Sequence, residues 1–147
     1  MTWNQAAERA GQIAAADVAP ALRSADHWDW VAIHGVLAVV LQALAVQTAV
    51  SPGDVPLRDV LEVLERGPAH VRRIVEPVAR AATESAAVDT WRWLTRTWPR
   101  PSGGPRDLRA QYGGMSRGIG AGHTGAAVDT VTPWAARAVE RAMEQGL

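Results

Sequence analysis

The feature that most constrains the fold is a twenty-residue stretch, 31–50, that is apolar on nearly every side of a helix. A helix of this kind must be buried, either at the centre of a helical bundle or inside a membrane, and twenty residues are long enough to cross a bilayer. However, His34, Gln42 and Gln47 interrupt the stretch, no arginine cluster marks a cytoplasmic end, and no second such segment follows. We therefore expect a buried core helix and no membrane association.

Three further stretches show the spacing of apolar residues that is typical of amphipathic helices. They predict helices over 2–19, over 56–66 and over 69–98. The apolar stripe of the third stretch stays in phase across Pro77, which predicts one kinked helix or two nearly coaxial ones.

The ends of two other helices are marked by capping residues. Asp26 is expected to cap the apolar helix, and Thr132 to cap a C-terminal helix with Pro133 at its first position. No stretch alternates between apolar and polar residues, so strands are not expected. The sequence therefore predicts an all-α fold, in which residues 1–147 form a single domain built as a bundle of about five helices.

A glycine-rich segment precedes the predicted C-terminal helix, with six glycines between Gly113 and Gly125. Glycine loses more backbone entropy on ordering than any other residue, so we expect a long flexible loop here and a second flexible segment over 99–105. The G-x-G-x-x-G string at 120–125 lacks the strand that a dinucleotide site requires, and the absence of lysine excludes a Walker-A loop. Backbone N–H groups beside Arg117 remain suited to a small anion.

Composition limits the compartment and the chemistry. The chain has no cysteine, which excludes disulfides and thiolate sites. Its N-terminus lacks the charged-then-apolar order of a signal peptide, so a cytoplasmic protein is expected. Fifteen arginines without any lysine or phenylalanine indicate a G/C-rich bacterial genome.

The charge is unevenly distributed along a chain whose net charge is zero. Residues 1–65 carry a balance of −5, and residues 66–117 a balance of +6. The favoured interpretation is that the charges of these two parts pair with each other within the fold. The second interpretation is that the basic part binds an anionic partner.

The sequence offers no recognisable catalytic or metal-binding pattern. His27 and His34 lie too far apart along a helix to share an ion, and no H-x-x-x-H or E-x-x-H occurs. Ser116 stands in a G-x-S-x-G string that lacks the strand–turn–helix context of a nucleophile. No catalytic residue, metal or cofactor is therefore predicted, His34 is expected to be a hydrogen-bonded core residue, and His123 a solvated one.

The strongest candidate for a binding surface is the segment 91–101, which interleaves tryptophan with arginine. These residue types dominate the hot spots of protein interfaces, and arginine beside stacking aromatics also serves nucleic-acid and phosphate surfaces. Helical phase assigns Trp91 and Trp98 to the core stripe, whereas Trp93 falls off it. Together with the glycine-rich segment, the predicted binding residues are Arg92, Trp93, Arg96, Trp98, Arg100, Tyr112, Gly113, Gly114, Met115, Ser116, Arg117 and His123.

The W-R-W-L run at 91–94, Leu108 and the Tyr112–Ser116 segment resemble a group of small uncharacterised helical bacterial proteins. Those proteins carry a W-x-x-W-L-like helix and end in a Gly-Gly-Met-Gly-Ser element, an Asn-Asp and a short apolar tail. Here Ser116-Arg117 replaces the second part of that element, and the Asn-Asp is absent. The resemblance covers about a quarter of the chain and implies an interaction protein of the toxin-immunity kind.

Three functions fit these observations. The leading hypothesis is a small soluble helical protein that binds a macromolecular partner, most favourably a protein, in an immunity or regulatory role. The alternative is a helical-bundle enzyme or small-ligand binder whose pocket is closed by the glycine-rich loop. The third is nucleic-acid binding through the Arg/Trp segment.

Overall fold

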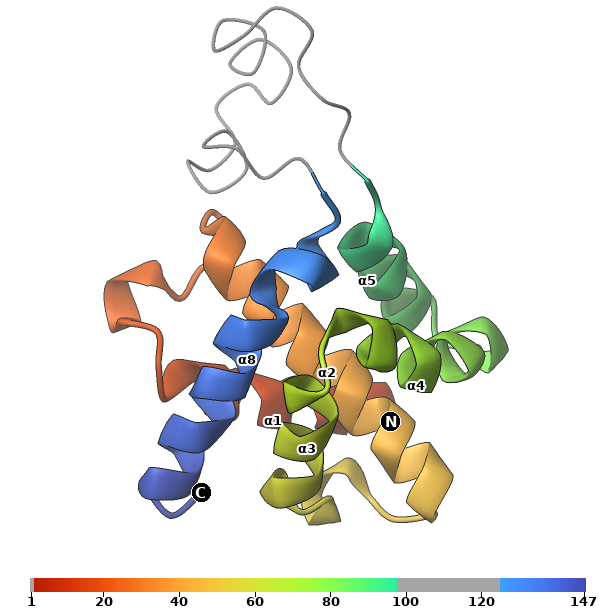
Figure 1. The fold of residues 1–147 in the computed structure, drawn as a ribbon, viewed down its shortest axis with the longest axis horizontal. Helices are drawn as coiled ribbons and strands as arrows, with labels where there is room; N and C mark the ends of the chain where they lie inside the picture. The colour runs from red at the N-terminus through yellow and green to blue at the C-terminus, as the bar shows by residue number, and fades with distance from the viewer. Residues whose placement is uncertain (1, 98–124) are drawn as a thin grey trace, which may run out of the picture.

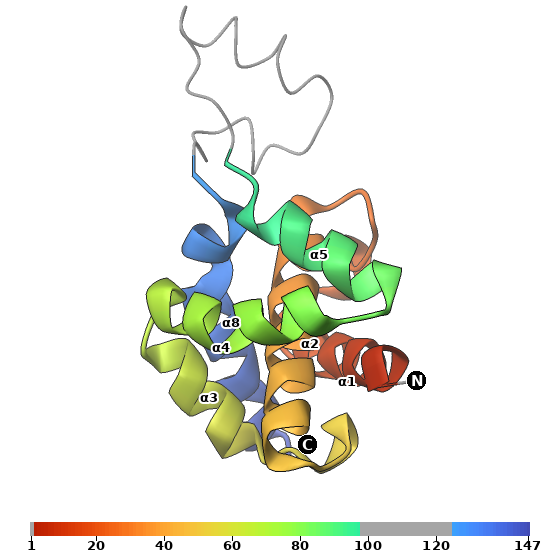
Figure 2. The same ribbon diagram turned by 90° about the vertical axis from the view of Figure 1, so that its right-hand side faces the viewer.

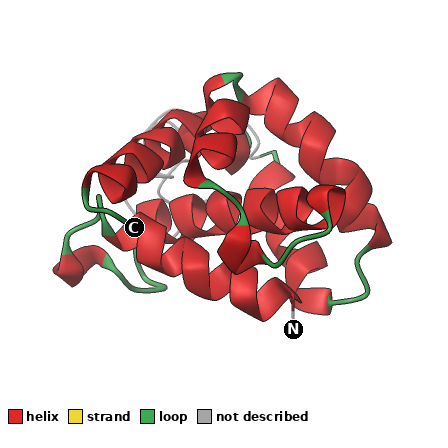
Figure 3. Cartoon of the chain, turned by 90° about the horizontal axis from the view of Figure 1, so that it is seen from below, coloured by secondary structure: helices red, strands yellow, loops and turns green. Residues whose placement is uncertain are grey.

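The computed structural model describes residues 2–97 and 125–147, and every regular element in these two stretches is helical (Figures 1 and 3). The predicted all-α class is therefore confirmed for this part of the chain. The α-helices are α1 (Thr2–Ala15), α2 (Trp28–Thr48), α3 (Leu57–Glu65), α4 (Pro68–Ala81), α5 (Ser85–Thr95) and α8 (Ala127–Glu144). The short 3-10 turns η1 (Pro20–Leu22) and η2 (Pro52–Asp54) precede α2 and α3.

Two predicted segments fall on residues that are not described. The segment 99–105 lies entirely outside them, as does the glycine-rich segment apart from Gly125.

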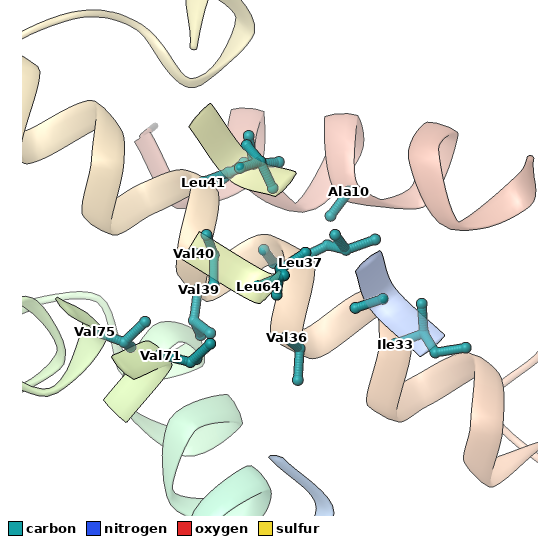
Figure 4. Close-up of a cluster of buried hydrophobic side chains, with 14 of the residues drawn as sticks. Ala10, Ile33, Val36, Leu37, Val39, Val40, Leu41, Leu64, Val71 and Val75 are labelled. Atoms are coloured by element: carbon teal, nitrogen blue, oxygen red, sulfur yellow. The ribbon is translucent and has the colours of Figure 1, made fainter. Parts of the chain in front are cut away.

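Helix α2 occupies the centre of the fold and contacts each of the other five α-helices. Figure 4 shows its side chains pointing to several sides, where they meet Ala10 of α1, Leu64 of α3 and Val71 of α4. By length and hydropathy α2 meets the requirements of a membrane span, yet 72% of its most apolar 18-residue window is buried inside the protein. In this fold, other helices cover the apolar surface of α2.

Small residues allow α1 and α2 to pack closely. Ala6, Ala10 and Ala14 of α1 are completely buried, and a Cβ at Gly11 would lie 3.6 Å from Nε2 of His34 in α2. Alanine loses no side-chain entropy on burial, so this interface is formed at low conformational cost.

The third predicted helix is in fact two helices, and Pro77 does not separate them. Helix α4 continues through Pro77 to Ala81, and extended backbone at Ala82 and Glu84 then ends it before α5 begins. The chain turns at this point, so α4 and α5 are not coaxial (Figure 2). The apolar stripe stays in phase because both helices turn their apolar faces to α2, not because one axis runs through both.

Two helix starts also differ from the predicted ones. Helix α2 begins at Trp28 with His27, not Asp26, in the capping position. Helix α8 begins at Ala127, so Pro133 lies inside it and Thr132 is not its cap. Burial of Val128 and Val131 before the proline outweighs the hydrogen bond that Pro133 cannot donate.

Among the described residues, the long-range ion pairs connect the acidic and the basic part of the sequence to α8. The expected pairing of these two parts with each other stays a prediction, because four arginines of the basic part lie outside the described residues. Asp17 accepts from Arg137 at 2.9 Å and lies 3.6 Å from Arg141, and Arg72 lies 3.2 Å from Asp129. The Asp17 side chain is only 11% exposed, so it ties the end of α1 firmly to α8.

Arg9 fixes the segment between α2 and α3 against α1. Its Nη1 donates to the carbonyl of Pro52 at 2.7 Å and to the carbonyl of Val55. Burial lowers the pKa of the Arg9 guanidinium, and the carboxylate of Asp54 opposes this shift.

We expect Arg9→Met to lower the free energy of unfolding by about 1–2 kcal/mol, because it leaves two carbonyls without their charged donor. Chemical denaturation measures the loss. Arg58→Met is the matched control, since Arg58 is exposed on α3, and it is expected to change the stability by less than about 0.5 kcal/mol. Equal losses in the two variants would show that the Arg9 contacts are not formed in solution.

Candidate functional site

The structure places three of the twelve predicted binding residues, Arg92, Trp93 and Arg96, at the C-terminal end of α5. The Arg92 side chain is 76% exposed, and its Nη1 lies 3.9 Å from Oδ1 of Asp89 one turn earlier. Arg96 caps the helix and is also exposed. The other nine lie outside the described residues: Trp98, Arg100, Tyr112, Gly113, Gly114, Met115, Ser116, Arg117 and His123.

Trp93 has one part in the core and one part at the surface. It is half-buried, and its ring lies 6.4 Å from the buried ring of Trp28 at an interplanar angle of 52°. Trp28 in turn meets Trp134 of α8 edge-on at 6.4 Å. Trp91 is buried, as helical phase predicts. Trp93 therefore lies off the apolar stripe of α5, but its ring contacts the buried core through Trp28.

A pocket of about 430 Å³ opens between α2 and α5, and Trp93 forms part of its wall. We call it the α2–α5 pocket. Helix α2 contributes Trp30, Val31, His34 and Gly35, α5 contributes Asp89, Thr90 and Trp93, and Ala25 lies at the edge.

Gly35 explains why the two helices come so close beside this pocket. A Cβ at Gly35 would lie 3.3 Å from Cγ2 of Thr90 and 3.4 Å from Cδ1 of Leu94. A side chain at this position would require the Thr90 and Leu94 side chains to shift by a few tenths of an ångström.

The polar groups of the pocket include a histidine with a fixed ring. Nε2 of His34 lies 2.7 Å from the carbonyl of Ala7, so Nε2 carries the proton and donates it. Nδ1 of His34 forms no hydrogen bond with the described residues. Trp30 packs against the same ring with centroids 5.4 Å apart. The expected hydrogen bond of His34 is therefore confirmed, although the residue is half-buried rather than enclosed.

The remaining polar groups of the pocket, Asp89 and Thr90, come from α5. Oγ1 of Thr90 donates to the carbonyl of Ala86 within its own helix, at 2.8 Å. Asp89 is largely exposed at the rim. Within residues 2–97 and 125–147, no group of three His, Asp or Glu side chains is placed to hold a metal ion. An apolar pocket with a few placed polar groups is typical of ligand or side-chain recognition.

Sequence reasoning singled out Trp93 and did not consider Trp30 or Asp89, which line the same pocket. Trp30 and His34 are four residues apart, so their shared helix face was visible in the sequence. Nothing in the sequence indicated that α5 would cover that face. No protein-family model, no curated protein and no solved structure matches this chain.

Proposed function

We propose that this chain is a soluble, cytoplasmic helical-bundle protein that binds another protein through the C-terminal end of α5 and the α2–α5 pocket. The observation that carries this proposal is the position of Trp93, which lines the pocket beside the exposed Arg92 and Arg96. Tryptophan and arginine at the edge of a pocket are the usual anchors of a protein interface. An apolar side chain of the partner would enter between Trp30 and Trp93.

The proposal includes the glycine-rich segment, from Tyr112 to Arg117 and His123, as a second part of the binding surface. It also gives the protein an immunity or regulatory role, in line with the resemblance of the 91–94 and 112–116 segments to small helical bacterial proteins.

The proposal is tested by photo-crosslinking from two positions. Benzoylphenylalanine replaces Arg92 in one protein and Arg58, exposed on α3, in the other. We expect position 92 to capture a defined protein that position 58 does not capture. Mass spectrometry identifies it, and binding is then measured with the purified partner.

Trp93→Ala should weaken binding of that partner by about thirtyfold or more, as loss of an interface anchor does. Circular dichroism must show that the variant remains helical. Arg58→Ala is the control and should bind as the original protein does. The proposal is wrong if both positions crosslink to the same proteins, or if Trp93→Ala leaves the affinity unchanged.

The alternative is a small-ligand binder, or an enzyme, that uses the same pocket. The observation in its favour is the pocket volume of about 430 Å³, which is in the range of small-molecule sites. Failure of position 92 to capture any macromolecule would favour this alternative.

The third candidate is nucleic-acid binding through Arg92 and Arg96, which are exposed on the same helix end. It predicts that affinity for a labelled single-stranded oligonucleotide falls log-linearly with salt as counterions are released. Arg92→Ala should then flatten this slope.

A further inference from the structure

Gln42 is a polar residue in the middle of the apolar helix α2, and it is only 7% exposed. The other buried polar residue in the described part of the chain, Thr132, bonds to the carbonyl of Val128 in its own helix. In contrast, no residue within 2–97 or 125–147 forms a hydrogen bond with the side chain of Gln42. The amide atoms of Gln42 are not fully enclosed by the protein, so they are open to a partner from outside the chain.

The Gln42 side chain lines a second pocket, of about 380 Å³, between the C-terminal half of α2 and the end of α4. We call it the α2–α4 pocket. Its walls are mainly apolar and include Val46, Val78, Ala81 and Ala82. It shares no residue with the α2–α5 pocket.

A carboxylate is held in position in the same pocket. Oε2 of Glu84, in the link between α4 and α5, accepts the backbone N–H of Trp3 at 3.1 Å. This bond leaves Oε1 as an acceptor for a ligand. The pocket therefore offers one amide, which both donates and accepts, and one carboxylate oxygen, which only accepts.

We propose that the α2–α4 pocket binds a small neutral molecule in which a primary carboxamide is attached to a branched apolar group. A primary carboxamide pairs with the Gln42 amide through one donor and one acceptor, and its second N–H is suited to Glu84. The apolar group fills the space beside Val46 and Val78. The negative charge of Glu84 disfavours a carboxylate of the same shape.

Three probes of nearly identical shape test this chemistry. They are 3-methylbutanamide, its carboxylate 3-methylbutanoate, and 4-methylpentan-2-one, in which a methyl group replaces the amide NH₂. Each is titrated into the full ¹⁵N-labelled chain, and NMR follows the side-chain NH₂ signals of Gln42 and the backbone signals of Val46 and Val78. We expect the carboxamide to bind at least about tenfold more tightly than the other two, since each tenfold corresponds to about 1.4 kcal/mol.

Two matched variants assign the binding to one amide. Gln42→Met keeps the length of the side chain and removes the hydrogen-bonding group, and Gln47→Met makes the same change at an exposed position of the same helix. Gln42→Met should weaken carboxamide binding at least about tenfold, and Gln47→Met should leave it unchanged.

The result that supports the proposal is selective carboxamide binding that moves the Gln42 NH₂ signals and is lost in Gln42→Met. Three results overturn it. They are no carboxamide binding at the solubility limit, equal binding of the three probes, and carboxamide binding that Gln42→Met retains. Shifts of the Gln42 NH₂ signals are measured in the unmodified protein, so this part of the test does not depend on how Gln42→Met folds.

Discussion

Replacing Trp28 by alanine is expected to lower the free energy of unfolding by about 3–5 kcal/mol, the usual range for a buried tryptophan. Trp28 is 5% exposed and stands at the first turn of the central helix. Its ring is the meeting point of Trp93 from α5 and Trp134 from α8. Its removal therefore opens a cavity where three helices meet. Chemical denaturation followed by circular dichroism gives the value.

Trp93→Ala is the matched variant in this measurement. Because Trp93 is half-buried and lines the α2–α5 pocket, we expect a smaller loss, of about 1–2 kcal/mol. The difference between the two losses in unfolding free energy measures how much more Trp28 contributes to the core than Trp93 does. An equal loss would place Trp93 wholly in the core and remove the main support for the proposed binding surface.

The second large effect is expected at Leu37, which is completely buried on α2 (Figure 4). Leu37→Ala should lower the free energy of unfolding by about 2–5 kcal/mol, since the packed helices around α2 close only part of the cavity. Domains of this size are stable by about 5–15 kcal/mol, so the loss is a large fraction of the total.

Leu22→Ala is the control, because Leu22 is 47% exposed in the turn η1. The same atoms are removed, and the expected change is within about 0.5 kcal/mol. Similar losses at the two positions would contradict the central burial of α2. That outcome would favour a membrane location for α2.

The all-α class followed from features that act over a few residues. The apolar run of α2 required burial whatever surrounded it, and the proline and glycine around α3 marked its ends within one residue. The same local rules failed where packing overrode them. Pro133 is accommodated inside α8 because buried neighbours hold that helix together, so Thr132 is not its cap.

The candidate site was predictable only in part, for a physical reason. Trp93 was found because a residue that leaves the apolar stripe of a helix is available for other contacts. Trp30 and Asp89 were missed because a pocket forms between helices, and the chain turn at 82–84 decides which faces meet. The nine other predicted residues stay predictions, since they lie outside the described part of the chain.

The long-range contacts of α8 determine when this fold is completed during protein synthesis. Helix α8 packs on α1, α2 and α3, and Arg137 pairs with Asp17, which is 120 positions earlier in the chain. The ribosome delivers α2 well before α8, so one side of the most apolar helix stays uncovered while synthesis proceeds. A nascent chain that holds α1 to α5 thus presents the kind of surface that chaperones recognise. Docking of α8 is the step that hides it.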